Sequence, residues 1–298
     1  MTSLSLDHLV IAVRDLECAT ESYRKLLGLS PSWRGRHPTY GTANVLFRLD
    51  NTYLELLAPA EAGESPWLRA LHEHLDTRGE GLYAIALGTE DIDGAVASAR
   101  ERGVDVAYPA AGEGVDLDTG ARREWANARI APASTRGVHA FFIQHRSPPD
   151  ALPIARPCAD DGAHVLGVDH LVVASSDLAN SLRLWQETFG LRLRRTVDWP
   201  GLEGPSSEGG RTLHFLRLAG TILELAGESA PDRPGARDLF WGVSYRVGDV
   251  AATVDRLRAD GIEVSDIRSG RAPNTAVADL KPGFSHDVRT LFIERESA

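Results

Sequence analysis

The chain has few cysteines and no long apolar run, and both absences narrow what it can be. Its 298 residues include only Cys18 and Cys158, too few on their own for a disulfide framework or a cysteine-based zinc site. No apolar stretch approaches the ~20 residues of a membrane helix, and the first residues lack the basic and apolar segments of a signal peptide. We therefore expect a cytoplasmic protein with no membrane partner.

Positive charge is also scarce. There are 32 Lys and Arg residues against 42 Asp and Glu, a formal net charge of −10. Because nucleic acids are bound through basic surfaces, this balance argues against a nucleic-acid partner. The glycine patterns of dinucleotide and phosphate loops are missing as well. The length suggests two domains, at about 150 residues each.

Several segments of the sequence occur twice. Residues 6–13, LDHLVIAV, recur as residues 168–175, VDHLVVAS. Residues 52–56, TYLEL, recur as residues 221–225, TILEL. A third segment, beginning at Asp91, recurs from Asp249. Internal repeats of this kind indicate duplicated structural units, so the chain contains four modules in the order A, B, A′, B′.

Each module has the same predicted plan. Residues 6–13 are short, apolar and β-branched, which is typical of a strand. Asp15 suits the N-cap of a following helix and Gly28 suits its end, with apolar residues between them at helical spacing. Strand-like segments follow at residues 44–49 and 53–58. The order in each module is therefore strand, helix, then two or three strands.

The modules define the expected domains. They span residues 1–60, 78–147, 164–228 and 238–298. The first pair forms an N-terminal domain, 1–147, and the second a C-terminal domain, 164–298. The proline-rich residues 148–163 between them are typical of a semi-rigid linker. The predicted fold class is α+β, in which each domain is a cupped mixed sheet with helices outside.

Strand alternation predicts that a histidine and a glutamate share the concave side of each sheet. The bulkier face of the first strand suits packing against the helix, which leaves His8 on the other face. The same argument places Glu55 beside His8, and His170 beside Glu224. A carboxylate in an apolar strand is costly unless it is paired or bound to a metal. Each pair is therefore either a metal site or a vestigial hydrogen bond.

These features resemble the vicinal oxygen chelate superfamily, which includes glyoxalase I, methylmalonyl-CoA epimerase, extradiol dioxygenases, and resistance proteins for fosfomycin and bleomycin. The resemblance rests on the βαβββ module, the Asp-His opening strand and the Leu-Glu-Leu fourth strand, and it covers nearly the whole chain. Residues 35–44, GRHPTYGTAN, further resemble a glyoxalase-like subgroup with His-Pro and Gly-Thr-x-Asn signatures. The fold is implied; the reaction is not, because the scaffold hosts many chemistries.

The resemblance implies a divalent ion, Fe, Mn, Zn or Ni, held by first and fourth strands inside a cup. The matching positions are His8, Glu55, Ala84 and Gln144 in the first half and His170, Glu224, Gly242 and Glu294 in the second. Alanine and glycine offer no ligand atom, and glutamine is a weaker ligand than a carboxylate. The stronger predicted set is therefore His170, Glu224 and Glu294, which suits a catalytic metal with an open position.

The leading expectation is a divalent-metal enzyme that acts on a small oxygen-rich substrate, by isomerisation, lyase chemistry or oxygenation. Glu224 or Glu294 would move the proton. Gly242 stands where the resemblance to extradiol dioxygenases would require a histidine. The superfamily often dimerises, but two domains in one chain already form a pseudo-dimer, so a homodimer stays open.

The alternative is a metal-free small-molecule binding or antibiotic-resistance-like sequestering protein. Trp241 and Tyr83 would then turn the cup into an aromatic slot for a flat ligand. Core packing explains Trp241 equally well. A third expectation is that one half catalyses while the other is structural.

Four further residues are candidates for the site. His37 lies in a segment flanked by Gly and Pro and is either an acid–base residue or a surface histidine. His214 lies in an apolar strand and either reaches the cavity or is structural, His286 is expected to line the second cup, and Arg271 to hold an anionic substrate. Residues 285–287 contain Ser, His and Asp, but neighbours in sequence do not readily form a triad.

Overall fold

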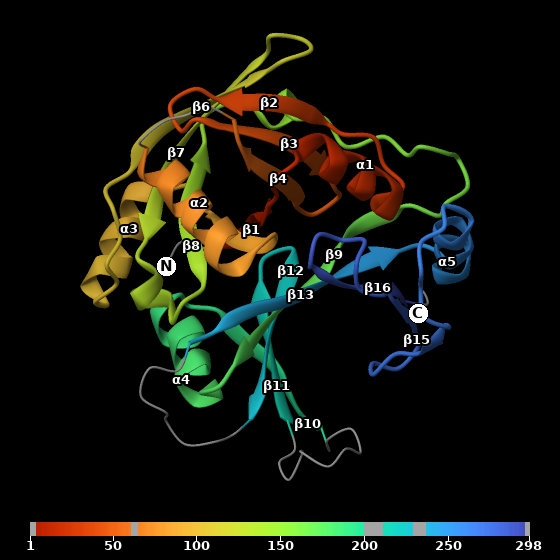
Figure 1. The fold of residues 1–298 in the computed structure, drawn as a ribbon. Helices are drawn as coiled ribbons and strands as arrows, with labels where there is room; N and C mark the ends of the chain where they lie inside the picture. The colour runs from red at the N-terminus through yellow and green to blue at the C-terminus, as the bar shows by residue number, and fades with distance from the viewer. Residues whose placement is uncertain (1–3, 61–64, 200–210, 229–236, 296–298) are drawn as a thin grey trace.

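Two groups of eight strands organise the chain. The computed structural model describes residues 4–60, 65–199, 211–228 and 237–295. Figure 1 shows the first group in red to green and the second in green to blue. Each group contains two βαβββ modules, which confirms the predicted α+β fold.

The first group is a closed barrel. Its helices and strands are β1 (Ser5–Ala12), α1 (Leu16–Leu27), β2 (Trp33–His37), β3 (Thr42–Arg48), β4 (Tyr53–Pro59), α2 (Pro66–Arg78), β5 (Gly81–Gly88), α3 (Ile92–Glu101), β6 (Ala110–Asp116), β7 (Arg122–Ile130) and β8 (His139–His145). The strands close in the order β1-β4-β3-β2-β6-β7-β8-β5. As predicted, Asp15 caps α1 by accepting the N–H of Cys18, and Gly28 ends the helix with a φ of 67°.

The second group is an open, curved sheet. Its elements are β9 (Val165–Ser175), α4 (Leu178–Arg183), β10 (Arg192–Trp199), β11 (Arg211–Leu218), β12 (Thr221–Glu228), β13 (Leu239–Val247), α5 (Val250–Ala259), β14 (Arg268–Ser269), β15 (Thr275–Asp279) and β16 (Arg289–Arg295). The strand order is β10-β11-β12-β9-β13-β16-β15-β14. Three short turns of helix complete the described chain: residues Pro132–Thr135, Pro149–Ala151 and Leu184–Thr188.

Helix α2 makes the interiors of the two halves different. It begins at Pro66 behind the N-cap Ser65, whose side chain accepts the N–H of Leu68. Leu71 and Leu75 then pack with side chains from the concave face of the barrel, including Val10. The helix therefore closes the first cup. No helix in the described part of the second half covers the corresponding face.

The two halves are joined by hydrogen bonds from Asn51 and by a shared apolar cluster. The Asn51 side chain donates to the carbonyl oxygens of Val168 and Gly220, both at 2.8 Å, and accepts the N–H of Val168 at 3.1 Å. One large apolar cluster contains side chains from both halves. Among the described residues, no helix is both long and apolar enough to cross a membrane.

Candidate functional site

The interior of the first barrel brings His8 and Glu55 together, as strand alternation predicts. His8 projects from β1 and Glu55 from the adjacent parallel strand β4. The His8 Nε2 atom lies 3.4 Å from Glu55 Oε2, and both side chains are almost fully buried. On its other side, His8 Nδ1 lies 2.7 Å from the Asp7 carboxylate. His8 thus lies between two carboxylates.

The signature segment that contains His37 joins the same cluster. Asn44 Nδ2 lies 2.7 Å from Glu55 Oε1 and 3.1 Å from His37 Nε2. An amide nitrogen carries two protons, so it can donate to both partners. The His37 Nδ1 proton is then directed to Thr42 Oγ1, at 2.9 Å. The result is a continuous chain of hydrogen bonds that ends at His8.

Two groups in this chamber point to a ligand. The Asn44 Oδ1 atom is buried and has no hydrogen-bond partner among the described residues, and such orphaned acceptors normally indicate an absent partner. Arg123 is only 7% exposed and stacks its guanidinium near the rings of Trp33 and Tyr53, at 5.6 and 5.5 Å. The described chain gives Arg123 no carboxylate partner. A buried acceptor and a buried cation therefore face the same space.

Aromatic side chains form the wall of this chamber. They are Trp33, Tyr40, Tyr53, Trp67, Tyr83, Trp125 and Phe141. The space that they enclose is small, about 70 Å³. The His8 ring stacks on Tyr53, with ring centroids 4.4 Å apart. The ligand that this chamber accepts is therefore small and in contact with ring faces.

Burial and hydrogen bonding separate the pKa values in this chamber. Burial would raise the pKa of Glu55, but the interactions with His8, His37 and Asn44 lower it to about 2. Burial would lower the pKa of His8, but hydrogen bonds to Asp7 and Glu55 outweigh it and raise that pKa. Burial lowers the pKa of His37. The environment thus favours an ionised Glu55, a protonated His8 and a neutral His37.

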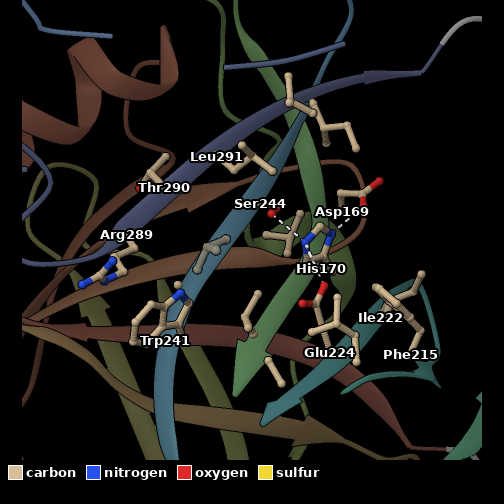
Figure 2. A pocket seen from close by; sticks show the side chains of 18 of the residues that line it. Asp169, His170, Phe215, Ile222, Glu224, Trp241, Ser244, Arg289, Thr290 and Leu291 are labelled. Atoms are coloured by element: carbon tan, nitrogen blue, oxygen red, sulfur yellow. Dashed lines mark hydrogen bonds and ion pairs between the residues drawn. The ribbon is translucent and has the colours of Figure 1, made fainter. Parts of the chain in front are cut away.

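The second half repeats the pair in a more open setting (Figure 2). His170 Nε2 lies 3.5 Å from Glu224 Oε2 and 2.8 Å from Ser244 Oγ. His170 Nδ1 lies 2.7 Å from Asp169, which also accepts two hydrogen bonds from Arg295. These interactions lower the pKa of Asp169, although burial opposes them. Burial raises the pKa of Glu224.

Arginine side chains surround this second site. The cleft has a volume of about 1650 Å³, and the described residues that line it include ten arginines and one lysine against four carboxylates. Trp241 is 44% exposed and lines the cleft, with the Arg289 guanidinium 4.0 Å from its ring centroid. Arg195 lies similarly over Phe215, at 4.8 Å. Trp241 is thus a cleft residue and not part of the core.

Comparison with known families identifies the scaffold. Residues 6–189 match the family model described as "Glyoxalase-like domain", and residues 167–280 match "Glyoxalase/Bleomycin resistance protein/Dioxygenase superfamily". The first match alone covers more than half of the chain. The chain belongs to this superfamily, the vicinal oxygen chelate proteins.

Curated relatives include two epimerases. The ethylmalonyl-CoA/methylmalonyl-CoA epimerase of Cereibacter sphaeroides is 35% identical over 101 residues, which are 34% of this chain and 72% of that protein. The human mitochondrial methylmalonyl-CoA epimerase is 32% identical over 97 residues, 33% of this chain and 53% of that protein. The chain thus spans only about half the length of the human relative.

Solved structures share the fold over the whole chain. A mutant of 4-hydroxymandelate synthase from Streptomyces coelicolor superposes with a TM-score of 0.70 at 16% identity, and covers 100% of this chain and 94% of its own. The Mn(II)-bound glyoxalase from Novosphingobium aromaticivorans gives a TM-score of 0.64 at 16% identity, with coverages of 100% and 84%. At such identities the likeness establishes the vicinal oxygen chelate fold alone.

The metal-ligand set expected in the second half does not form. Glu294 lies on the helix side of β16, where its Oε2 atom accepts the N–H of Val250 at the start of α5, at 2.9 Å. Gln144 occupies the same place in the first half and accepts the N–H of Ile92 in α3, at 3.3 Å. These two residues are helix caps. The expectation that Glu294 joins His170 in the cup is therefore wrong.

The donor atoms of this vicinal oxygen chelate protein do not fit the superfamily's divalent ion. The first chamber holds His8, His37 and Glu55, but both ring nitrogens of His37 are engaged, by Thr42 Oγ1 at 2.9 Å and by Asn44 Nδ2 at 3.1 Å. The first-strand and fourth-strand positions of the second module in this half, Ala84 and Ile143, are apolar. In the second half, the Nε2 atom that would bind the ion is engaged by Ser244. Throughout the described residues, no group of three or more His, Cys, Asp or Glu side chains could hold a metal.

The other predicted residues are divided between the two halves. His37 and Tyr83 line the first chamber, and Arg271 lines the second cleft. His214 lies on the outer face of β11, where it contacts Thr196 at 2.9 Å, so it does not reach the cavity. His286 turns away from the second cup to contact Glu80 of the first half at 2.6 Å, which corrects its placement.

Three parts of the sites were not predicted from the sequence. Arg123 gave no signal because it stands in a charged segment, residues 122–124, that suggests solvent exposure. Ser244 could have been found from the repeat. The first half has Ala86 at the matching position, opposite His8, so the change to serine opposite His170 marks a difference between the two halves. Helix α2 was outside the repeated plan, because each module was expected to contain only one helix.

Proposed function

We propose that the chain is an enzyme that moves a proton on a small oxygen-rich substrate, in an isomerase or lyase type of reaction inside the first barrel. The observation that carries this proposal is the hydrogen-bonded chain from His37 through Asn44 and Glu55 to His8. It connects His37 and Asn44, which lie in the glyoxalase-like segment 35–44, to the His8–Glu55 pair. An unpartnered acceptor and a buried arginine face the same space.

The roles follow from the charge states that the chamber favours. Glu55 is held ionised and acts as the base, while His8 is held protonated and acts as the acid. Paired titratable groups whose environments push their pKa values apart are suited to such a division. Asn44 and His37 are positioning residues, because they fix the orientation of the Glu55 carboxylate.

Arg123 and the strength of the base restrict the substrate. A carboxylate with a pKa of about 2 is a weak base, and it removes only hydrogens that neighbouring groups have made acidic. A carbon next to a carbonyl meets this condition when a cation binds the oxygen that gains charge. Arg123 supplies that cation, and Asn44 Oδ1 accepts a hydrogen bond from a hydroxyl or acid group of the substrate.

This mechanism contains no step through the superfamily's divalent ion. It departs from the metal-dependent expectation because the ring nitrogens of His37 are engaged by Thr42 and Asn44, which leaves His8 and Glu55 as the metal-type donors of the chamber. The proton transfers assigned to His8 and Glu55 use only groups that the chamber holds.

A binding protein is the second candidate. The observation that favours it is the wall of seven aromatic side chains around a small space of about 70 Å³. Such a wall binds a flat or cationic ligand through ring faces without any reaction.

One experiment separates the two candidates. Small keto acids, hydroxy acids and malonate-type esters are first screened for binding by the rise in melting temperature. Bound compounds are then incubated with the protein in D2O, and mass spectrometry measures deuterium incorporation at carbon. We expect incorporation with the wild type and a loss of about a hundredfold or more in Glu55→Gln, the scale of general-base catalysis.

The control variant is Glu113→Gln. Glu113 is a carboxylate on β6 of the same barrel that pairs with Arg122 at 2.9 Å, outside the chamber. This variant should exchange deuterium like the wild type. Compounds that bind in the chamber but never exchange would support the binding protein and contradict the enzyme.

A further inference from the structure

The second cleft contains a hydrogen-bonded serine, histidine and aspartate. Ser244 Oγ lies 2.8 Å from His170 Nε2, and His170 Nδ1 lies 2.7 Å from Asp169 Oδ1. When the Asp169 carboxylate accepts the Nδ1 proton, Nε2 is left to accept the Ser244 hydroxyl proton. Arg295 fixes Asp169 through two contacts, at 2.7 and 2.8 Å. Figure 2 shows Asp169, His170 and Ser244 in this order.

The strands explain how these side chains meet. Ser244 on β13 is paired directly with His170 on the antiparallel strand β9, and the register shifts between Ser244 and Tyr245. Bulges of this kind redirect side chains and are common beside active sites. Ser244 is 2% exposed, yet it belongs to the lining of the cleft.

The first half provides an internal comparison. Asp7 and His8 repeat the Asp169–His170 contact, also at 2.7 Å, but the residue paired with His8 across the strands is Ala86. The serine is therefore not required by the fold at this position. Its hydroxyl occurs only in the half whose cleft is open.

We propose that Ser244 is the nucleophile of a second active site, which transfers or hydrolyses acyl groups of anionic esters or thioesters. This activity goes beyond the proton transfer proposed for the first barrel, and it uses none of the same side chains. His170 is the general base, and Asp169 and Arg295 are positioning residues, in the roles known from serine–histidine–aspartate sites on unrelated folds. Asp169 and His170 are neighbours in sequence, but their side chains are in contact at 2.7 Å, and the serine comes from a different strand.

Each step balances in atoms and charge. Ser244 Oγ forms a bond to the acyl carbon while its proton passes to His170 Nε2. The bond between the acyl carbon and the leaving oxygen or sulfur then breaks, and His170 returns the proton to the leaving group. Water attacks the acyl-serine in the same way, which releases the acid and restores the Ser244 hydroxyl. No oxidant or reductant is needed.

The surroundings of His170 suit this role. The imidazolium that forms after proton transfer lies between the Asp169 carboxylate and Glu224, whose Oε2 is 3.5 Å from Nε2. Arg195 and Arg271 line the same cleft as Ser244 and His170. Cationic side chains that line an acyl-transfer site can stabilise the negative charge that develops on the substrate oxygen.

The charge of the cleft identifies the substrate class. Among the described lining residues, eleven cationic side chains face four carboxylates, in a protein of net charge −10, so the cleft carries an excess of positive charge. An excess of this kind attracts oppositely charged ligands. The acyl substrate therefore carries a carboxylate, phosphate or sulfate group.

Labelling with a fluorophosphonate tests the nucleophile, because this reagent bonds covalently to activated serine hydroxyls. The intact protein is incubated with the reagent, and peptide mass spectrometry locates the adduct. We expect one adduct per chain at Ser244, no adduct in Ser244→Ala, and labelling at least about a hundredfold slower in His170→Ala. Because Ala86 occupies the matching position in the first half, Ser244→Ala should fold, which circular dichroism verifies.

Ser285→Ala is the matched control. Ser285 is another buried serine of the second half, but its Oγ donates to the carbonyl oxygen of Val288, so this variant should label like the wild type. An unlabelled wild-type protein would overturn the proposal. So would an adduct at Ser285, or labelling of Ser244 at the same rate in His170→Ala.

Discussion

Replacing Glu294 tests whether this carboxylate caps a helix or binds a metal. In Glu294→Ala the N–H of Val250 loses its acceptor at the start of α5, and the helix loses a negative charge near its positive end. Loss of a capping acceptor costs about 1 kcal/mol, and loss of the charge adds about 0.5 kcal/mol. The melting temperature should therefore fall by roughly 3–5 °C, on the scale observed for domains of this size.

Two further variants sharpen this test by calorimetry. Glu294→Gln keeps an acceptor and loses only the charge, so its melting temperature should fall by roughly 1–2 °C. Gln144→Ala removes the neutral cap of α3, so its melting temperature should fall by an amount between those of the two Glu294 variants. If Glu294→Ala kept the wild-type melting temperature and instead lost a bound metal in elemental analysis, the capping argument would be refuted.

Three more predictions concern charge and metal content. The folded pKa of Glu55, about 2, is below the ordinary 4.5, so its stabilisation is present above pH 4.5 and disappears as the pH falls towards 2. Urea unfolding should accordingly show a gap between wild type and Glu55→Gln that narrows from pH 6 to pH 3; a constant gap would contradict the assignment. Elemental analysis after reconstitution with Fe, Mn, Zn or Ni should find no stoichiometric metal, and about one metal per chain that is lost in His8→Ala or His170→Ala would show otherwise. Hydrolysis of a carboxylate-bearing p-nitrophenyl ester should slow as salt rises, because salt screens the charge of the cleft, whereas equal salt dependence for a neutral ester would argue against the anionic substrate.

The fold was predictable from the internal repeats and the family resemblance. The two His–Glu pairs were predictable because side chains alternate between the two faces of a strand with a period of two residues. In β1 and β4 one face is bulky and apolar, and only that face fits against a helix. The alternation therefore places His8 and Glu55, and by the repeat His170 and Glu224, without knowledge of the structure. The caps at Asp15 and Gly28 were predictable for an equally local reason.

The position of Glu294 was not predictable in this way. In β16, Leu291 and Ile293 occupy one face and Phe292 occupies the other, so both faces are apolar and alternation does not identify the inner one. His214 on β11 presents the same ambiguity, because apolar residues precede and follow it. Where both sides of a strand are covered, only the register with the neighbouring strand determines which side faces the cup.

Helix α2 could be predicted as a helix but not as a lid. Its leucines at 68, 71 and 75 have helical spacing, which indicates an apolar face without naming the surface that this face covers. The concave surface that it covers is assembled from strands of both modules, including β1, β5 and β8. The size of the first chamber therefore depends on long-range packing that no local pattern contains.

The same Asp-His dyad is completed differently in the two halves, and this difference favours separate ligands. Asp7 also binds His145, at 3.0 Å, in a chamber that α2 closes and aromatic side chains line. Asp169 instead binds Arg295, and its histidine binds Ser244. About a third of all Lys and Arg residues of the chain line the second cleft. An aromatic space of about 70 Å³ and a cationic cleft of about 1650 Å³ do not fit one substrate, so loss of Ser244 and loss of Glu55 should affect different compounds.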